Sequence, residues 1–342
     1  MTLADPVILS GAPGSPYTRK MLAVLRYRRI AYRFIIGNNG GVPGLPRPKV
    51  ALLPTFYLPD ATGTLEAVTD STPLIRRFEQ DYSGRSIVPS NPALAFIDAL
   101  IEDYADEWLT KAMFHYRWAF ADDVAKAGAI LPCWRGFSIP DEDLAKASDF
   151  ISDRQIGRLR YVGSNAITGP AIEASYCRFL EAFEDHLRQY PYLLGHRPSA
   201  CDFGIYGQLT QLAEFDPTPM SLTLKLAPRV TAWTGILDDQ SGVEITDKAW
   251  FDPDALPPTL LAILSEIGRV YTPVMLANAT AVVSGATEVT AEVDGLAWSQ
   301  QPFPYQAKCL RALREDYAAL PASARAQVDK ALAGTGCEPL FT

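Results

Sequence analysis

The first 85 residues alternate between short apolar runs and amphipathic stretches. The apolar pattern predicts a buried strand over residues 6–10, a helix over 16–28 and a second strand over 31–36. One face of the helix is apolar, with Met21, Leu22 and Leu25. Most of its basic residues are expected on the opposite face: Arg19, Lys20, Arg26, Arg28 and Arg29.

A Gly/Pro-rich segment at residues 37–49 reads as a loop. Two short strands are predicted after it, over 55–58 and 64–68, and a helix begins at Ser71 and runs to about Tyr82. The predicted order in this first part of the chain is therefore β-α-β-loop-β-β-α.

The remaining chain has a predominantly helical pattern. After a linker near 83–93, a long amphipathic stretch reaches residue 120. Further helices are predicted near 141–150, 152–161, 169–190, 200–214 and 227–239. Beyond 245, two helical segments fall within 259–284, an alternating strand-like stretch covers 286–298, and helices follow over 304–319 and 322–333. The pattern predicts three parts: 1–85, 93–244 and an extension over 245–342.

Composition narrows the possible functions. The net charge of -8 argues against a general nucleic-acid surface. The sequence shows no run of about 18 apolar residues and no basic segment leading into a long apolar one, so we expect no membrane span and a cytoplasmic location. Its five cysteines and three histidines are scattered, which predicts neither a disulfide framework nor a metal site.

Three short motifs in the first 85 residues contain groups suited to binding chemistry. They are Ser15-Pro16-Tyr17-Thr18 at a strand-to-helix turn, Leu53-Pro54-Thr55 before a strand, and Asp70-Ser71 at a helix start. Each also has a purely structural interpretation, since serine caps helices, proline shapes loops and acids favour helix N-termini. A serine at a helix N-terminus nevertheless offers a hydroxyl beside free backbone N–H groups, an arrangement that favours an anion.

The order and spacing of these motifs resemble the glutathione transferase family, in its serine-type classes. The resemblance implies an α/β thioredoxin-like N-terminal domain followed by an all-α domain, with glutathione as the bound thiol. It implies that Ser15 donates a hydrogen bond to the glutathione sulfur. It also implies that Pro54 is cis, that the backbone of Leu53 pairs with the cysteinyl part, and that Asp70 and Ser71 hold the γ-glutamyl group.

A fourth motif, "SACDFGIYGQL" at residues 199–209, is similar to the family's structural capping box, with Ser199 and Asp202 as its two members. Two features depart from the family pattern. A loop replaces the usual second helix, so Arg47 and Lys49 are candidates for the glycine carboxylate by charge alone. The family also more often has glutamate where this chain has Asp70. Extended bacterial members share the stretch "PFPYQAKCLRALR", to which we assign no role.

The proposed anion is a thiolate brought in on glutathione. A free cysteine thiol has a pKa of about 8.5, and a hydroxyl donor at a helix N-terminus favours its ionised form. Ser15 is preferred as that donor over Tyr17, and the N–H groups of Tyr17 and Thr18 lie nearby. Thr18 occupies the second thiol position of a redox CxxC motif, which argues against dithiol chemistry.

The second substrate is expected between the two domains, against the helix over 94–120. Tyr104 and Trp108 are the principal candidates for its apolar wall, together with Phe114, Tyr116 and Trp118. Such a wall suits an apolar or aromatic electrophile. For each of these residues taken singly, a place in the helix–helix core is the structural alternative.

The sequence thus predicts a glutathione S-transferase, a detoxifying enzyme of aromatic compounds that catalyses conjugation, ether or halide cleavage, or isomerisation. The alternative is a non-catalytic binding or scaffold protein of the same fold. A serine hydrolase is disfavoured because proline follows Ser15 and no pattern ties a histidine to it. A homodimer is expected from the resemblance. The extension is expected to cap the site, widen the dimer contact or wrap the helical domain.

Overall fold

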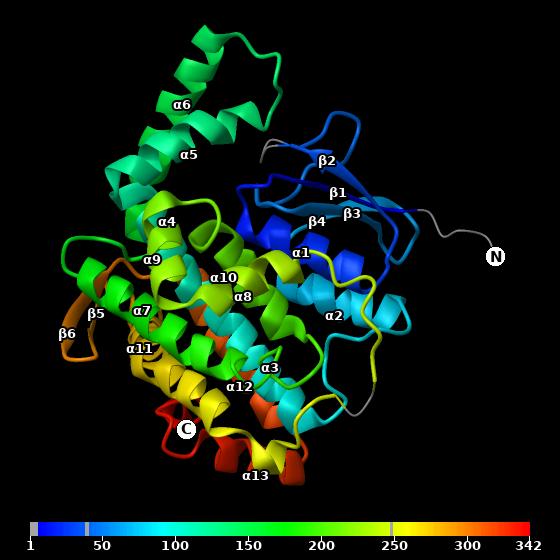
Figure 1. Cartoon of the computed structure of the whole chain (residues 1–342), viewed down its shortest axis with the longest axis vertical. Coiled ribbons are helices and arrows are strands. Elements are labelled where there is room, and N and C mark those ends of the chain that lie inside the picture. Colours follow the sequence, from blue (N-terminus) through cyan, green and yellow to red (C-terminus); the bar gives the residue numbers. More distant parts are fainter. Residues whose placement is uncertain (1–5, 38–40, 247–248) are drawn as a thin grey trace.

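A four-stranded sheet forms the centre of the N-terminal domain in the computed structural model, which describes residues 6–37, 41–246 and 249–342. Its strands are β1 (Val7–Gly11), β2 (Tyr32–Ile36), β3 (Thr55–Pro59) and β4 (Leu65–Val68), in the order β2-β1-β3-β4. β1 and β2 run parallel, and the other neighbouring pairs are antiparallel. Helices α1 (Pro16–Tyr27) and α2 (Ser71–Asp81) complete a thioredoxin-like domain (Figure 1). The predicted order is confirmed.

The predicted loop between β2 and β3 is also confirmed for its described part. Residues 41–54 contain no helix or strand, while residues 38–40 lie outside the described residues. The repeated prolines and glycines of this segment explain the result, because proline lacks a backbone donor and glycine disfavours helix.

The basic face predicted for α1 is only partly exposed, which corrects the sequence interpretation. Lys20 is 1% exposed and Arg28 is 6% exposed. Lys20 is buried because α1 packs closely against α8 (Ala200–Leu212) of the helical domain. The contact is close enough that a Cβ on Gly207 of α8 would lie 2.6 Å from the carbonyl oxygen of Pro16. Arg28 instead pairs with Glu79 of α2 at 2.8 Å.

The second part of the described chain is helical and is built around α8, whose thirteen residues are all buried. The long stretch predicted to reach residue 120 consists of α3, a π-helical segment and α4 in direct succession. The elements are α3 (Pro92–Tyr104), π segment η1 (Ala105–Leu109), α4 (Thr110–Ala119), α5 (Ala121–Cys133), α6 (Asp141–Ile156), 3-10 turn η2 (Leu159–Tyr161), α7 (Gly169–Leu187), α8, α9 (Pro217–Leu226) and α10 (Pro228–Leu237). α5 and α9 were not predicted, and one helix, α6, replaces the two predicted over 141–161.

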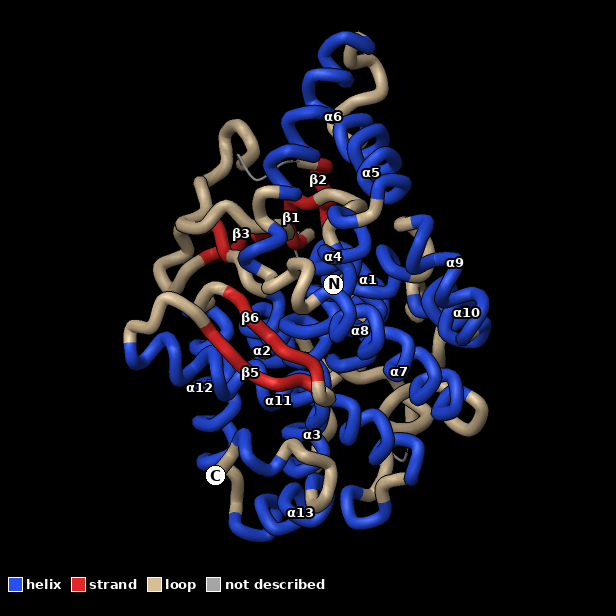
Figure 2. The backbone as a smooth tube through the Cα atoms, turned by 90° about the vertical axis from the view of Figure 1, so that its left-hand side faces the viewer, coloured by secondary structure: helices blue, strands red, loops and turns tan. Residues whose placement is uncertain are grey.

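The last part contains a long helix, a hairpin and two further helices. Its elements are 3-10 turn η3 (Pro253–Ala255), α11 (Pro258–Ser284), β5 (Val289–Val293), β6 (Leu296–Gln300), α12 (Pro304–Ala319), α13 (Ala322–Leu332) and 3-10 turn η4 (Glu338–Leu340). α11 runs through Pro273 as one helix where two segments were expected. The stretch predicted as one strand forms two antiparallel strands, a hairpin (Figure 2). The chain turns at Asp294 and Gly295, which have φ angles of 53° and 78°.

The extension wraps the helical domain and shares its core. α11 packs against α7 and α3, and both α12 and α13 pack against α3. Leu260, Leu264 and Ile267 of α11 are fully buried, and the Trp298 ring of β6 lies 5.2 Å from that of Trp108. Of the three roles expected for the extension, wrapping the helical domain describes its main contacts.

By length and composition alone, α11 would be able to cross a membrane, and it is the one such helix among the described residues. Within the protein, however, 61% of its most apolar stretch is buried against other elements. Its apolar character therefore matches its place in the core of a folded domain.

Candidate functional site

Ser15 caps the N-terminus of α1. Its Oγ accepts a hydrogen bond from the backbone N–H of Thr18 at 3.2 Å, and Pro16 occupies the first helical position. The Thr18 N–H is thus used by the cap, which leaves the N–H of Tyr17 without a hydrogen-bond partner among the described residues. The hydroxyl proton of Ser15 makes only a long contact of 3.4 Å with the carbonyl oxygen of Leu53. Ser15 therefore keeps a donor available for a ligand.

The loop that carries Leu53 faces this cap. The Leu53–Pro54 peptide bond is cis, as the resemblance implies. Pro54 is buried and Leu53 half-buried. In the described part of the chain the backbone N–H of Leu53 forms no hydrogen bond, so a peptide ligand lying here would find a free donor beside the Ser15 hydroxyl.

The turn between β1 and α1 is held by the helical domain. Arg117 of α4 donates to the carbonyl oxygen of Gly14 at 2.9 Å, and Gln211 of α8 donates to that of Pro13 at 3.2 Å. Arg117 is itself fixed by a buried ion pair with Asp216 at 2.9 Å. The sequence carried no signal for this role, because Arg117 lies in an aromatic-rich helix without a recognisable motif.

Asp70 and Ser71 lie where α2 begins. Asp70 has a φ angle of 85° and makes no capping bond to its own helix. A non-glycine residue in this region of φ is strained, and such strain concentrates at functional sites. The Asp70 carboxylate instead accepts a hydrogen bond from the hydroxyl of Tyr305 in α12, at 2.8 Å. Ser71 is buried, with its Oγ 3.1 Å from the ammonium nitrogen of Lys20.

Lys20 links this region to the helical domain. Its ammonium nitrogen lies 2.7 Å from Glu102 Oε1 and 2.6 Å from Asp106 Oδ2, and all three side chains are buried. Burial lowers the pKa of Lys20, but the attraction of the two carboxylates outweighs it and raises that pKa. Burial also raises the pKa of Asp106 to about 6 despite the neighbouring lysine. α1 therefore carries Ser15 at its start and a charged link to Ser71 in its second turn.

Tyr17 points to the domain interface. Its hydroxyl donates to the backbone carbonyl oxygen of Asp106 at 2.8 Å and lies 3.3 Å from Thr110 Oγ1. Burial raises the pKa of Tyr17 well above its usual value, as do the nearby carboxylates of Asp106 and Glu107. The hydroxyl is therefore engaged and protonated.

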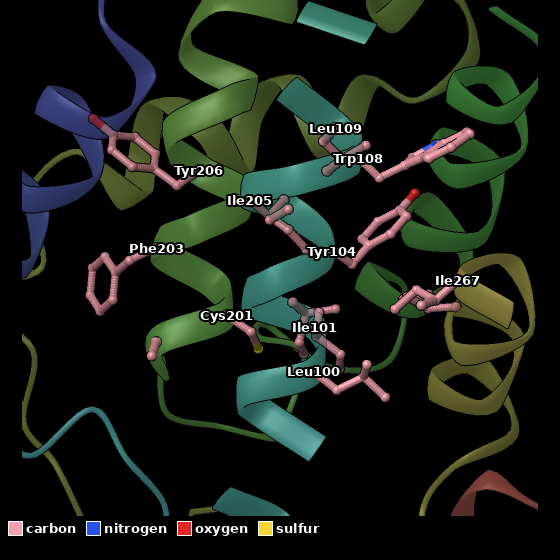
Figure 3. Close-up of a cluster of buried hydrophobic side chains, with 14 of the residues drawn as sticks. Leu100, Ile101, Tyr104, Trp108, Leu109, Cys201, Phe203, Ile205, Tyr206 and Ile267 are labelled. Atoms are coloured by element: carbon pink, nitrogen blue, oxygen red, sulfur yellow. The ribbon is translucent and has the colours of Figure 1, made fainter. Parts of the chain in front are cut away.

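Tyr104 and Trp108, expected to line the second-substrate pocket, lie in the core instead. They are 0% and 1% exposed. The Trp108 indole N–H donates to Ser175 of α7 at 3.1 Å, and Tyr104 packs on Phe179 of the same helix. In Figure 3 both rings point to the side of α3 opposite to that of Tyr206. Helical spacing places Tyr104 of α3 and Trp108 of η1 on the face that packs on α7. The sequence could not distinguish this face from a pocket face.

The apolar side chains nearest the Ser15 turn come from α5 and the residue after it. A Cβ placed on Gly14 would overlap the side chains of Leu131 and Trp134, so both lie directly against this turn. The ring of Trp134 also packs on Phe215, with centroids 5.4 Å apart. Sequence reasoning missed this group because α5 was not predicted as a helix.

The remaining candidates are placed as follows. Arg47 and Lys49 are exposed on the loop before β3. The capping box is confirmed, since the Ser199 backbone N–H donates to Asp202 Oδ2 at 2.9 Å and the serine side chain reaches the same oxygen. Thr18 is fully buried and packs against Gly11.

In the part of the chain that the structure describes, the Ser15 side chain forms no hydrogen bond with a histidine. Among the described residues, no group of three or more His, Cys, Asp and Glu side chains could hold a metal ion. His115 bonds to Ser164 at 2.8 Å and to Glu173 at 3.3 Å, and His186 bonds to Thr259 and the Tyr192 carbonyl. The arrangement at Ser15 can therefore supply a hydroxyl donor and a helix N-terminus, the elements that stabilise a bound anion.

Comparison with known families identifies this domain. Residues 9–86 match the family model described as "Glutathione S-transferase, N-terminal domain". The N-terminal domain of this chain is therefore similar to that of the glutathione S-transferases. The resemblance found in the sequence is thereby confirmed for the family, and the match indicates a glutathione-binding, transferase-like function. The serine-type and bacterial assignments stay predictions.

Solved structures of glutathione S-transferases are similar to the chain at low identity. The tau-class enzyme from mango, Mangifera indica, is 17% identical, covers 75% of this chain and 96% of its own, and gives a TM-score of 0.43. A glutathione S-transferase from Rhodospirillum rubrum is 15% identical, with a TM-score of 0.40. The match covers 74% of this chain and 97% of that protein. A glutathione S-transferase from Methylobacterium radiotolerans, in complex with glutathione sulfonate, is 14% identical, with a TM-score of 0.41. The match covers 71% of this chain and 99% of that protein.

The search of curated proteins found no match to the chain. The glutathione S-transferase assignment therefore rests on the match of the N-terminal domain.

Proposed function

We propose that the protein is a glutathione-dependent transferase in which Ser15 stabilises the glutathione thiolate. The observation that carries the proposal is the direction of the Ser15 hydrogen bonds. Its Oγ accepts from the Thr18 N–H, and the acceptor for its own proton is the Leu53 carbonyl oxygen, at the long distance of 3.4 Å. A thiolate sulfur at this position would accept a hydrogen bond from the Ser15 hydroxyl and lie at the positive end of α1. Tyr17 is the less favoured donor because its hydroxyl is already engaged by Asp106.

The other proposed contacts follow the three motifs. The backbone of Leu53 would pair with the cysteinyl part of glutathione, and Ser71 with the γ-glutamyl carboxylate beside the Lys20 ammonium. Asp70 would receive the γ-glutamyl amine. Arg47 and Lys49 stay candidates for the glycine carboxylate because of their charge alone.

The proposed reaction begins with attack of the thiolate on an apolar or aromatic electrophile. In conjugation, the sulfur forms a bond to carbon while the leaving group departs with the electron pair of the bond that breaks. We propose that Leu131 and Trp134, which lie against Gly14, provide apolar surface for this electrophile. Ether or halide cleavage and isomerisation start from the same thiolate. A homodimeric state, a cytoplasmic location and a role in detoxification of aromatic compounds stay predictions of the family resemblance.

The test compares Ser15→Gly with Ser15→Thr. Glycine is a tolerated N-cap that costs only a few tenths of a kcal/mol, whereas threonine retains the hydroxyl. We expect the thiol of bound glutathione to titrate below about 8.5 in the unaltered protein and in Ser15→Thr. In Ser15→Gly we expect that shift to be lost and turnover of an aryl halide to fall about 10- to 100-fold. The thiolate is followed by its ultraviolet absorbance.

The non-catalytic alternative predicts a different pattern. A scaffold protein of this fold would bind glutathione without lowering its thiol pKa and without turnover. The thiol pKa and the turnover therefore separate the two cases. Calorimetric titration beside Ser71→Ala tests the glutathione site itself, since loss of binding in this variant supports that site. If the unaltered protein does not bind glutathione, the proposed function is overturned.

A further inference from the structure

The C-terminal extension reaches the N-terminal domain at one chemically informative point. Tyr305, in the first turn of α12, donates its hydroxyl to Asp70 Oδ2 at 2.8 Å, across 235 residues of sequence. Among the described residues, Tyr305 is the one hydrogen-bond partner of the Asp70 carboxylate. The Asp70 side chain forms no capping bond to its own helix, so the contact that orients this carboxylate comes from the extension.

The position of Tyr305 is fixed by anchors on both sides. Before it, Phe303 and the Asn278 side chain of α11 form two reciprocal bonds, of 2.7 Å and 3.0 Å. After it, the buried Gln306 side chain donates to the carbonyl oxygen of Glu107 at 3.0 Å. Further along α12, Asp316 forms an ion pair with Arg76 of α2, the helix that begins after Asp70. The start of α12 is thus tied to α11 and to η1 of the helical domain, and its later turns to α2.

The chemistry of the pair fits an orienting role. Tyr305 is 37% exposed, and the partial burial of its hydroxyl raises its pKa, as does the negative charge of its neighbours, including Asp70. The phenol therefore keeps its proton and acts as a donor. The bond uses Oδ2 of Asp70 and leaves Oδ1 able to accept from a cation. A carboxylate fixed in this way loses less conformational freedom when it binds an ammonium group.

We infer that Tyr305 is a positioning residue of the glutathione site, which holds Asp70 in place to bind the γ-glutamyl amine. The inference rests on the proposed function and extends it. It assigns a role to α12 that the sequence pattern left without one. The extension then supplies part of the binding site and covers the helical domain as well.

The test measures the affinity of two ligands for Tyr305→Phe by calorimetry. One ligand is glutathione, and the other is its analogue without the α-amino group. Loss of one orienting hydrogen bond is expected to weaken glutathione binding about 3- to 10-fold. The analogue has no ammonium group for Asp70, so its affinity should change less than twofold. In an Asp70→Asn background, Tyr305→Phe should add no further loss for glutathione.

The matched control is Tyr317→Phe, which removes a hydroxyl from the same helix where it bonds to Asp329 at an exposed position. This variant should leave both affinities unchanged. The inference is overturned if Tyr305→Phe behaves like Tyr317→Phe, or if it weakens both ligands equally, because an equal loss indicates a displaced helix. Absence of glutathione binding by the unaltered protein is a separate result that overturns the proposed function itself.

Discussion

Lys20 shows how a single charged residue can join two domains. Three residues face its ammonium group within 3.1 Å, and two of them are carboxylates from α3 and η1. Lys20 directly precedes Met21, which belongs to the apolar face of α1. Because lysine is charged, the sequence analysis placed Lys20 on the solvent face. Only the packing of α8 against α1, which is not visible in local periodicity, decides that the side chain is buried.

Lys20→Met is therefore expected to destabilise the fold strongly. Removing the cation leaves Glu102 and Asp106 buried without their partner, which costs about 3–5 kcal/mol of unfolding free energy. Urea unfolding followed by circular dichroism measures the change. Arg19→Met is the matched control, because Arg19 pairs with Asp238 at a partly exposed position and such pairs contribute about 0–1 kcal/mol. Equal effects of the two substitutions would contradict the account of Lys20.

At the scale of elements, sequence reasoning succeeded where strong local signals exist. The Ser15 cap, the Gly/Pro-rich loop and the box of Ser199 and Asp202 each depend on residues close together in the chain. The hairpin of β5 and β6 carried a local signal too, because Asp294-Gly295 between alternating strands favours a tight turn, but the stretch was predicted as a single strand. α5 was missed, and with it the Leu131–Trp134 surface. No helical pattern of polar and apolar residues was recognised over its thirteen residues, of which only Asp123, Ala127, Gly128 and Pro132 are buried.

The contact between α1 and α8 depends on a glycine. In Gly207→Ala the new Cβ would lie 2.6 Å from the Pro16 carbonyl oxygen, so the helices must separate. We expect a loss of about 1–3 kcal/mol and a thermal midpoint lowered by several degrees. Gly235→Ala in α10 is the control, since its nearest neighbour atom is 3.8 Å away and alanine favours helix. Thermal unfolding should show Gly235→Ala to be neutral or stabilising, and a stable Gly207→Ala would refute the close contact.

For the whole molecule, buried acids determine how stability depends on pH. Asp98 of α3 accepts a bond from the Cys201 N–H at 2.8 Å at the start of α8, and burial raises its pKa to about 8 from 3.8. The folded protein therefore holds a proton that the unfolded chain releases. Unfolding releases this proton between the two pKa values, so stability falls as the pH rises through that window.

The expected result is a decrease in unfolding free energy from pH 5 to pH 8. One such proton contributes a slope of up to about 1.4 kcal/mol per pH unit. Asp98→Asn should make the slope shallower, because asparagine does not titrate. Asp60→Asn should leave it unchanged, since Asp60 is exposed and its pKa is lowered, outside this range. Urea unfolding at several pH values measures the slopes, and an unchanged slope in Asp98→Asn would contradict the assignment.

The bond between Asp70 and Tyr305 also has a consequence for the order of events during protein synthesis. A ribosome that has completed the whole thioredoxin-like domain must still add more than two hundred residues before Tyr305 emerges. The sheet and its two helices have time to form first, because domains generally fold as units from the N-terminus. The Asp70 carboxylate then lacks this partner until the chain has been translated through the start of α12. A nascent chain interrupted before α12 would contain Ser15 and Ser71 but lack this bond.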